Sequence, residues 1–301
     1  MRTWKSTLRT LSKPLYHGWE TNHDPRNTVF LAGSGRSGTT WISEIINADG
    51  SFRYIFEPFS CRKTPEWRTF EFQQYFPRTY HDSQALEAAT RILSGRVHNA
   101  WVDSQNRTIL ARRRLVKDIR TNLMLGWLKE NFPAMPMVLL VREPLAVVAS
   151  RRRLGWGPTM GLERMRRMPR LIDEHLAPWM GFIEENADDE FAMQVINWCI
   201  EHLVPLQQLR EGEYQLLQYE RILADPAAEV GALFDYLGLR LSGRHLARLR
   251  RPSATASSVM RRGNASGGST VPQSRQVSTN DRLKAREIVE RFGLESLVAR
   301  S

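Results

Sequence analysis

The segment TVFLAGSGRSGTTW, residues 28–41, constrains the fold of this chain more than any other part of its sequence. The run from Thr28 to Ala32 is short and apolar, which predicts a buried strand. From Thr39 onward the apolar residues recur at helical spacing. A turn of small residues between a strand and a helix directs backbone N–H groups and the positive end of the helix dipole at one point. The segment therefore predicts an anion site, to which the guanidinium group of Arg36 adds further donors.

Four more strand-like runs alternate with helical sequence along the chain. They span Phe52–Phe56, Ile109–Val116, Met137–Val141 and Tyr214–Gln218. Helices are expected after Pro144 and over residues 171–185, 190–209, 226–237 and 281–292. Such alternation is typical of a largely parallel sheet with right-handed crossovers. The predicted fold class is α/β, a three-layer sandwich with a central, mainly parallel sheet and a P-loop-like turn.

The sequence predicts an N-terminal extension, residues 1–26, followed by a single domain, residues 27–301. A length of 301 residues suits one large domain. Within the domain, residues 251–280 are rich in Ser, Gly, Thr and Pro and show no periodicity. A loop of this length is typical of a lid or of a disordered segment. We expect it to cover a bound cofactor, with plain disorder as the alternative.

The net charge of the chain is +11 at pH 7, and most of its cations are arginines. Arginine binds phosphate, sulfate and carboxylate through two parallel hydrogen bonds, so an anionic partner is expected, although a biased genome composition would give the same excess. No nucleic-acid-binding motif accompanies the charge, so no nucleic acid partner is expected. The arginine runs 112–114 and 151–153 are interpreted as solvent-exposed faces or edges of the anion site.

Cysteine content and hydropathy narrow the class of protein further. Cys61 and Cys199 form no metal-binding or disulfide pattern, which favours a reducing compartment. The sequence contains neither a secretory apolar region nor a run of about 20 apolar residues that would span a membrane. A cytoplasmic protein without a transmembrane segment and without a bound metal is therefore expected.

The glycine-rich turn nearly satisfies the P-loop pattern GxxxxGK[ST]. Gly33 and Gly38 are in place, but Thr39 occupies the position of the lysine. Phosphoryl transfer needs that lysine and an acidic ligand for Mg²⁺, and no predicted strand end clearly supplies one. A sulfuryl group carries less negative charge, so arginine, lysine and hydroxyl donors suffice for its transfer. A P-loop kinase-like phosphotransferase and a non-catalytic binder of nucleotides or polyanions are the alternatives.

The stretch RSGTTWISEI, residues 36–45, resembles the 5′-phosphosulfate-binding loop of sulfotransferases that use 3′-phosphoadenosine 5′-phosphosulfate (PAPS). Cytosolic members of that family usually carry Lys where this chain has Arg36. The resemblance implies an enzyme with PAPS as sulfuryl donor and 3′-phosphoadenosine 5′-phosphate (PAP) as product. It implies a phosphosulfate site made of Arg36, Ser37, Gly38, Thr39 and Thr40. It also implies that Trp41 packs near the adenine.

A second stretch, VLLVREPLAVVAS at residues 138–150, is similar to the 3′-phosphate motif of the same family. Arg142 follows a predicted strand and Ser150 lies about two turns into the next helix, so both can reach one phosphate. Further on, the segment LLQYE at residues 216–220 is similar to a family strand that ends in Tyr-Glu, which implies Tyr219 near the adenine. Met260–Gly263 resembles the family segment that closes over the 3′-phosphate, which implies three more cofactor ligands: Arg261, Arg262 and Gly263.

The histidine base of the cytosolic members is missing from this chain. Those members supply it from a Lys-Thr-His segment, whereas the analogous place here reads Val116-Lys117-Asp118. Lys117 is expected to act with Arg36 as a cation on the transferred group. The base must therefore come from another part of the chain.

Glu57, in the segment FEPF, resembles a carboxylate of carbohydrate sulfotransferases that is thought to deprotonate a sugar hydroxyl. The apolar neighbours Phe56 and Phe59 are expected to raise its pKa toward neutrality. A structural carboxylate paired with an arginine is the alternative reading of Glu57. His81 and His98 are the alternative bases.

The resemblance leaves the acceptor open, because this scaffold serves many chemistries. A hydroxyl, less often an amine, of a carbohydrate, lipid or small metabolite is expected to receive the sulfuryl group. The aromatic segment Trp67–Tyr80 favours an acceptor with an apolar or ring-bearing surface, or else serves core packing. The sequence predicts no particular oligomeric state.

Overall fold

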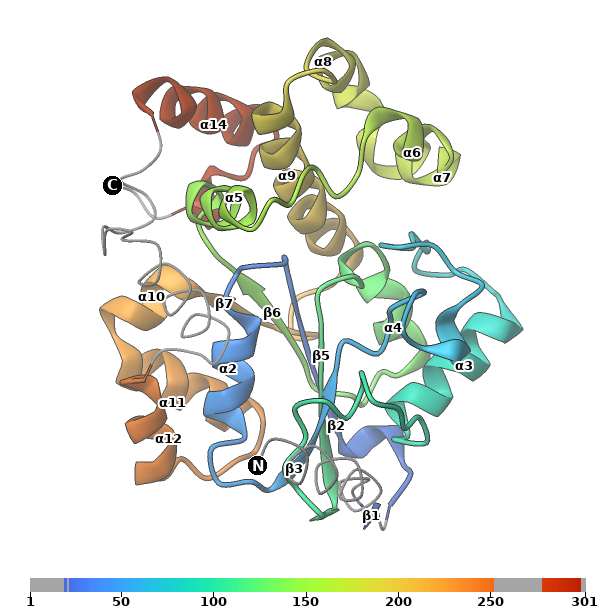
Figure 1. Ribbon diagram of the computed structural model, residues 1–301, viewed down its shortest axis with the longest axis vertical. Helices are drawn as coiled ribbons and strands as arrows, with labels where there is room; N and C mark the ends of the chain where they lie inside the picture. The colour runs from blue at the N-terminus through green and yellow to red at the C-terminus, as the bar shows by residue number, and fades with distance from the viewer. Residues whose placement is uncertain (1–18, 21, 252–277, 299–301) are drawn as a thin grey trace, which may run out of the picture.

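A five-stranded parallel sheet forms the centre of the computed structural model, which describes residues 19–20, 22–251 and 278–298 (Figure 1). Its strand order is β3-β5-β2-β6-β7. These strands are β2 (Thr28–Gly33), β3 (Phe52–Phe56), β5 (Arg113–Asp118), β6 (Met137–Val141) and β7 (Gln215–Gln218). A separate parallel ladder joins β1 (Trp19–Glu20) to β4 (Leu110–Ala111). The strand that precedes the glycine-rich turn is thus the central one and is buried along its whole length.

Helices cover both faces of the sheet. Because side chains alternate along a strand, Phe30 lies in one hydrophobic core and Leu31 in the other. The core around Leu31 includes side chains of α2 (Thr39–Ile46), α10 (Tyr219–Ala224) and α11 (Pro226–Tyr236). The core around Phe30 includes side chains of α3 (Ser83–Leu93), α4 (Leu125–Asn131), α5 (Pro144–Arg153), α9 (Glu190–Gln208) and α14 (Thr279–Arg291). The predicted α/β class with three layers and a parallel central sheet is confirmed.

The remaining described elements are short. They are α6 (Leu162–Arg166), α7 (Pro169–Leu171), α8 (Met180–Glu185), α12 (Gly243–Leu249) and the 3-10 turns Pro25–Asn27, Pro65–Trp67, Asn122–Met124, Ala177–Trp179 and Glu295–Leu297. Figure 1 shows α5, α9 and α14 above the upper ends of the strands, with α6 to α8 beyond α9. None of the helices in the described ranges is long and apolar enough to cross a membrane.

The parallel register gathers the carboxyl ends of the strands at one edge of the sheet. Ala32 of β2 is paired with Asp118 of β5. Since the strands all run in one direction, the residues that follow them lie at the same edge. This edge therefore carries the turn at residues 34–38, Glu57 after β3 and Arg142 after β6.

The third strand begins later than the hydrophobic pattern predicts. The expected strand spans residues 109–116, whereas β5 spans Arg113–Asp118 and Leu110–Ala111 belongs to the separate ladder. Strand β5 ends in two buried charged residues, Lys117 and Asp118, which a search for apolar runs does not include. The four other expected strands agree with the structure to within one residue at either end.

Arg114, expected on an exposed face, is fully buried. Its Nε donates hydrogen bonds to Thr28 Oγ1 at 2.9 Å and to the Leu93 carbonyl oxygen at 3.0 Å, and its Nη1 donates to the Asn22 carbonyl oxygen at 2.5 Å. These acceptors replace the water that burial removes from the guanidinium group. The prediction of an exposed arginine run is therefore wrong for this residue.

The helix expected over residues 171–185 is divided into short segments. A π-helical turn, Ile172–Leu176, follows α7, and a 3-10 turn precedes α8. Pro178 lies in that 3-10 turn and has no N–H to donate, which removes one helical hydrogen bond and favours a break at this place. The predicted helix is wrong as one element, although its sequence is helical in pieces.

Two predictions of domain organisation fall mostly on parts of the chain outside the described residues. Residues 1–18 and 252–277 are not among the residues described. The boundary at residue 26 and the cofactor-covering loop at 251–280 therefore stay predictions.

Candidate functional site

The turn between β2 and α2 has a tightly constrained backbone. Gly38 has a φ of 102° and Arg36 a φ of 78°, both in the left-handed region. A Cβ at Gly38 would lie 2.9 Å from the Tyr219 ring, and one at Gly33 would lie 2.7 Å from the Leu140 carbonyl oxygen. The Trp41 N–H donates to the Gly38 carbonyl oxygen at 2.9 Å, whereas the N–H groups of Thr39 and Thr40 come before the first intrahelical acceptor and lie at the positive end of the helix dipole. This geometry fits the anion site that the sequence predicts.

Arg36, Arg142 and Ser150 meet beside this turn. Nε of Arg36 donates a hydrogen bond to Ser150 Oγ at 3.0 Å, and Nη1 of Arg142 lies 3.4 Å from the Arg36 carbonyl oxygen. Within the described part of the chain, no carboxylate forms an ion pair with either guanidinium group. Burial lowers the pKa of Arg36, and the neighbouring cations Arg142 and Arg153 lower it further. Two like charges held side by side favour a bound anion.

Two buried polar atoms at this place lack hydrogen-bond partners in the described ranges: Ser37 Oγ and Arg142 Nε. Leaving a buried polar group unpaired costs about 1–3 kcal/mol, which makes such atoms rare. An anionic ligand would supply the acceptors that both donors lack. The orphaned atoms therefore indicate where ligand oxygens belong.

Two aromatic rings border the turn. The ring centroids of Trp41 and Tyr219 lie 5.4 Å apart, and the guanidinium group of Arg142 lies 4.3 Å from the Tyr219 ring centroid. Trp41 comes from α2 and Tyr219 opens α10 after β7, so the register of the sheet brings them together. They form an apolar wall next to the cationic cluster.

The structure gathers nine of the predicted cofactor residues at this edge of the sheet: Arg36, Ser37, Gly38, Thr39, Thr40, Trp41, Arg142, Ser150 and Tyr219. Thr39 and Thr40 are buried in the first turn of α2. Arg261, Arg262 and Gly263 lie outside the described residues. The role of all twelve as cofactor ligands stays a prediction.

Glu57 is held by two cations at the end of β3. Lys117 Nζ donates to Glu57 Oε1 at 2.5 Å, and Arg120 Nη1 donates to Glu57 Oε2 at 2.6 Å. The Glu57 side chain is only 7% exposed, so water screens these pairs weakly. The Lys117 ammonium group also lies 4.7 Å from the Phe56 ring centroid. One carboxylate is thereby fixed at the same edge of the sheet as the turn, with both of its oxygens engaged.

The expectation that apolar neighbours raise the pKa of Glu57 is wrong. Burial by itself raises this pKa, but the charges and hydrogen bonds of Lys117 and Arg120 outweigh burial and hold the pKa below its ordinary value. Burial lowers the pKa of Lys117, and the Glu57 carboxylate opposes that change. Glu57 is therefore ionised at neutral pH and able to accept a proton.

Asp118 and Arg120 belong to the same cluster, although the sequence reasoning assigned neither a role. Asp118 accepts hydrogen bonds from the Phe59 N–H at 2.9 Å and the Arg120 N–H at 2.7 Å. Burial raises the pKa of Asp118 to about 6, against the attraction of Arg120. The segment Lys117-Asp118-Ile119-Arg120, with three charges after an apolar run, is the signal that could have identified both.

The two alternative histidine bases differ in position from Glu57. His98 Nδ1 lies 3.0 Å from Arg53 Nη2 and 3.5 Å from a carboxylate oxygen of Asp103. Arg53 lies near the start of β3, whereas Glu57 follows its end, about 13 Å away at 3.3 Å per residue. His81 is exposed to solvent. Glu57 is thus the candidate base that lies at the edge with the anion site.

Most of the aromatic segment at residues 67–80 serves core packing. Trp67, Tyr75 and Phe76 are buried in the hydrophobic core, and the Trp67 ring centroid lies 4.8 Å from that of Phe59. Packing against other apolar side chains accounts for these rings without an acceptor. Phe72 belongs to the same segment but is half-buried, and its ring lies close to guanidinium groups rather than in the core.

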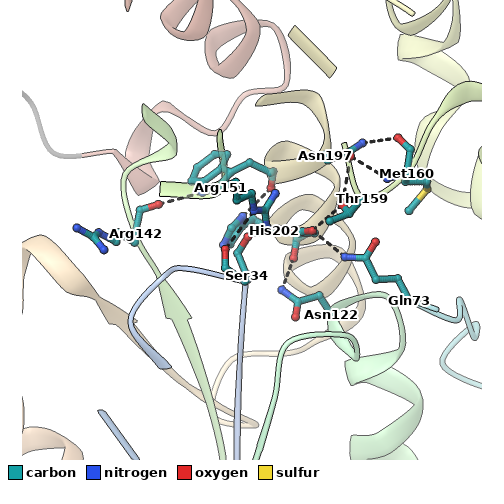
Figure 2. A network of polar contacts seen from close by, with 12 residues as sticks. Ser34, Gln73, Asn122, Arg142, Arg151, Thr159, Met160, Asn197 and His202 are labelled. Atoms are coloured by element: carbon teal, nitrogen blue, oxygen red, sulfur yellow. Dashed lines mark hydrogen bonds and ion pairs between the residues drawn. The ribbon is translucent and has the colours of Figure 1, made fainter. Parts of the chain in front are cut away.

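Arg151 and Glu201 form a buried ion pair under the turn (Figure 2). Nη2 of Arg151 donates to Glu201 Oε2 at 2.9 Å and to Ser34 Oγ at 2.7 Å, and its Nε donates to the Gly35 carbonyl oxygen at 3.1 Å. Ser34 Oγ also donates to Glu201. Both charged side chains are no more than 2% exposed. Residues 151–153 are interpreted from the sequence as a solvent-exposed face or an edge of the anion site; the exposed face is wrong for Arg151, which instead contacts the turn at Ser34 and Gly35.

Glu201 joins three other segments to the turn, two through its carboxylate and one through its backbone. Glu201 Oε1 accepts hydrogen bonds from Gln73 Nε2 at 2.7 Å and Thr159 Oγ1 at 3.1 Å, and its carbonyl oxygen accepts one from Asn122 Nδ2 at 2.8 Å (Figure 2). These partners are far from Glu201 in the sequence, so no local pattern could have identified the network. It fixes the backbone from which the anion site is built.

No group of three His, Cys, Asp or Glu side chains in the described ranges is arranged to hold a metal ion. The cations of the site come from arginine and lysine side chains. The described side chains at this edge of the sheet thus offer cationic donors for an anion and one ionised carboxylate.

Comparisons with known proteins identify one family. The model of the sulfotransferase family matches residues 28–243 of the chain. Among solved structures, the sulfotransferase domain from the curacin biosynthetic pathway is similar at 16% identity, over 88% of this chain and 96% of that chain, with a TM-score of 0.44. The mouse sulfotransferase SULT7A1 complexed with PAP is similar at 13% identity, over 94% of this chain and 90% of that chain, with a TM-score of 0.47. A comparison with curated protein sequences finds no significant match.

Removing one partner of the Arg151–Glu201 pair should destabilise the fold strongly, because the other charge stays buried without compensation. We expect Glu201→Gln or Arg151→Met to lower the free energy of unfolding by about 3–5 kcal/mol, measured by urea denaturation. The control is Arg166→Gln, which breaks the exposed pair with Glu184 and should cost less than about 1 kcal/mol. Equal losses in the buried and exposed variants would contradict this account.

Asp118→Asn should gain stability relative to the parent protein as the pH rises. In the folded protein the pKa of Asp118 is raised to about 6, whereas in the unfolded chain it is about 3.9, so its ionisation removes stability between these pH values. Asparagine does not titrate. The difference in free energy of unfolding should therefore move toward the variant by about 2–3 kcal/mol from pH 4 to pH 7, in urea denaturation at each pH. A difference that does not change with pH would contradict the raised pKa.

Proposed function

The chain belongs to the sulfotransferase family, and we propose that it transfers a sulfuryl group from PAPS to a hydroxyl, less often an amine, of a carbohydrate, lipid or small-metabolite acceptor. The observation that carries this proposal is the cluster of Arg36, Arg142 and Ser150. It joins the turn that resembles a phosphosulfate-binding loop to the segment that resembles a 3′-phosphate motif. A single nucleotide with phosphates at both positions accounts for that juxtaposition.

The side chains present fit such a nucleotide. Ser37 Oγ and Arg142 Nε are buried donors that lack acceptors among the described residues, and glycine at position 38 lets the Tyr219 ring pack directly against the turn at the N-terminus of α2. In this proposal the turn holds the 5′-phosphosulfate, Arg142 and Ser150 hold the 3′-phosphate, and the Trp41–Tyr219 wall packs against the adenine.

Glu57, Lys117 and Arg36 perform the chemistry in this proposal. When bound, PAPS supplies the sulfuryl group: its bond to a phosphate oxygen breaks, a bond to the acceptor oxygen forms, and PAP leaves with the bonding electron pair. Glu57 accepts the proton of the acceptor hydroxyl. Because its pKa is low, it takes this proton as the new oxygen–sulfur bond makes the hydroxyl acidic. Lys117 and Arg36 place positive charge where negative charge develops.

Two other functions explain less of the site. A P-loop phosphotransferase would have a lysine in place of Thr39 and no use for the Arg142–Ser150 motif. A non-catalytic polyanion binder would have no use for a carboxylate that two cations hold at the anion site. The proposed sulfuryl transfer uses both the Arg142–Ser150 motif, for the 3′-phosphate, and Glu57, as the base.

PAP should bind tightly and through its 3′-phosphate. We expect calorimetric titration to give a dissociation constant on the order of micromolar for PAP, with much weaker binding of ADP and of ATP with Mg²⁺, because only PAP offers a phosphate to Arg142 and Ser150. Arg142→Ala should weaken PAP binding at least about tenfold. Arg152→Ala, which removes an exposed arginine of α5, should not. A preference for ATP with Mg²⁺ would support the phosphotransferase instead.

Glu57→Gln should abolish most of the turnover while PAP still binds, because glutamine cannot accept the proton. With labelled PAPS and an acceptor selected from a panel of hydroxyl compounds, we expect kcat to fall about 10²–10⁴-fold. The control is Glu130→Gln, because Glu130 is also a carboxylate paired with an arginine. This variant should keep the kcat of the parent protein. Turnover of Glu57→Gln within a few-fold of the parent would exclude Glu57 as the base.

A further inference from the structure

Two arginine side chains share the ring of Phe72 next to the proposed base. The guanidinium carbon of Arg120 lies 5.4 Å from the centroid of this ring, and that of Arg164 lies 5.3 Å from it. Arg120 follows β5, Arg164 lies on α6, and Phe72 lies between β3 and α3 in the sequence. Three distant segments thus bring two like charges to one aromatic ring.

The protein leaves several donors of these arginines without acceptors. Arg120 donates from Nη1 to Glu57, but its Nε is buried without a partner in the described ranges. Nε and Nη2 of Arg164 are buried without a partner as well, and its Nη1 lies 3.4 Å from the Thr159 carbonyl oxygen. The carboxylate of Glu71 lies 3.7 Å from Arg164 Nη2, beyond hydrogen-bond distance, and is half exposed. Cationic donors therefore exceed acceptors here.

Neighbouring charges add to this excess. Burial lowers the pKa of Arg164; Glu71 opposes this change, whereas the cations Arg167 and Arg62 add to it. Buried guanidinium N–H groups without acceptors cost stability, and so does the repulsion between like charges. A bound anion with several oxygen atoms would offset both costs.

We propose that the acceptor carries an anionic group, a carboxylate, phosphate or sulfate, which binds to Arg164 and to Nε of Arg120. This inference rests on the proposed function, because Arg120 also holds the carboxylate of Glu57. An acceptor bound in this way has its anionic group on Arg120 and its reacting hydroxyl beside Glu57. The site takes compounds that combine a hydroxyl with a nearby anionic group, such as a hydroxy acid, a phosphorylated alcohol or an acidic sugar.

The test is thermal unfolding of the PAP-saturated protein in sodium acetate, phosphate or sulfate, each compared with sodium chloride of equal ionic strength. PAP fills the phosphate sites at Arg36 and Arg142, so the remaining rise in unfolding temperature comes from another anion site or from the general stabilisation that phosphate and sulfate give because they are excluded from protein surfaces. We expect at least one anion to stabilise the parent protein above the chloride reference. The part of this stabilisation that Arg164→Gln loses is the contribution of the site, and the ranking of that part shows whether the site prefers a carboxylate, a phosphate or a sulfate.

Variants of α6 assign this stabilisation to the proposed site. The dissociation constant for the anion is obtained from the dependence of this stabilisation on anion concentration. It should rise about tenfold or more in Arg164→Gln. Arg166→Gln is the matched control, because Arg166 lies on the same helix but is exposed and paired with Glu184. It should leave the constant unchanged. Arg164→Lys keeps the positive charge but not the planar guanidinium group, so its dissociation constant should be intermediate. This variant replaces Arg164→Gln in the test if Arg164→Gln does not fold.

Equal stabilisation of the parent and Arg164→Gln would overturn the proposal, and so would the absence of any rise above chloride in the parent. PAP affinity, measured separately, should stay within about twofold in Arg164→Gln, since the two sites share no contact. Failure of the parent to bind PAP would contradict the proposed function alone. The anion series, repeated without PAP and compared between the two variants, would still decide whether Arg164 holds an anion.

Discussion

The parallel register of the central sheet is the constraint on which the site depends. Because Ala32 is paired with Asp118 and Phe56 with Lys117, the turn after β2 and Glu57 after β3 lie at one edge. A slip of one residue would move the side chains of a strand to the opposite face. The buried guanidinium group of Arg114 ties β5 to Thr28 of β2 and so helps to fix this register. Binding and chemistry are brought together by strand pairing.

The charges at this edge divide into two kinds. The Arg151–Glu201 pair and the contacts of Lys117 with Glu57 are compensated, and they hold the turn and the carboxylate in place. Arg142, in contrast, forms no ion pair in the described part of the chain and keeps a buried N–H without an acceptor. Charges that are oriented in advance stabilise a bound anion without reorganisation during the reaction. Uncompensated charges of this kind lower the stability of the folded protein, which is the usual trade-off between stability and function.

The predictable parts of the fold and the site are those with local signals. The strand, turn and helix around Gly38 follow from residues that are adjacent in sequence. The position of Arg142, between a strand and the helix that carries Ser150, follows from adjacent residues as well. The Arg151–Glu201 pair could not be predicted, because its partners are 50 residues apart and each looks like a surface charge. The pKa of Glu57 was wrongly expected to rise because its sequence neighbours are apolar, whereas its neighbours in space are cations.

The most direct test of the central claim is a crystal structure of the protein with PAP. The account predicts that the 5′-phosphate lies on the turn at residues 34–38 with Ser37 Oγ as a donor, and that the 3′-phosphate contacts Arg142 and Ser150. The adenine should pack against Trp41 or Tyr219. Density for PAP at another edge of the sheet, or in an orientation that leaves Arg142 and Ser150 without a phosphate, would contradict the account.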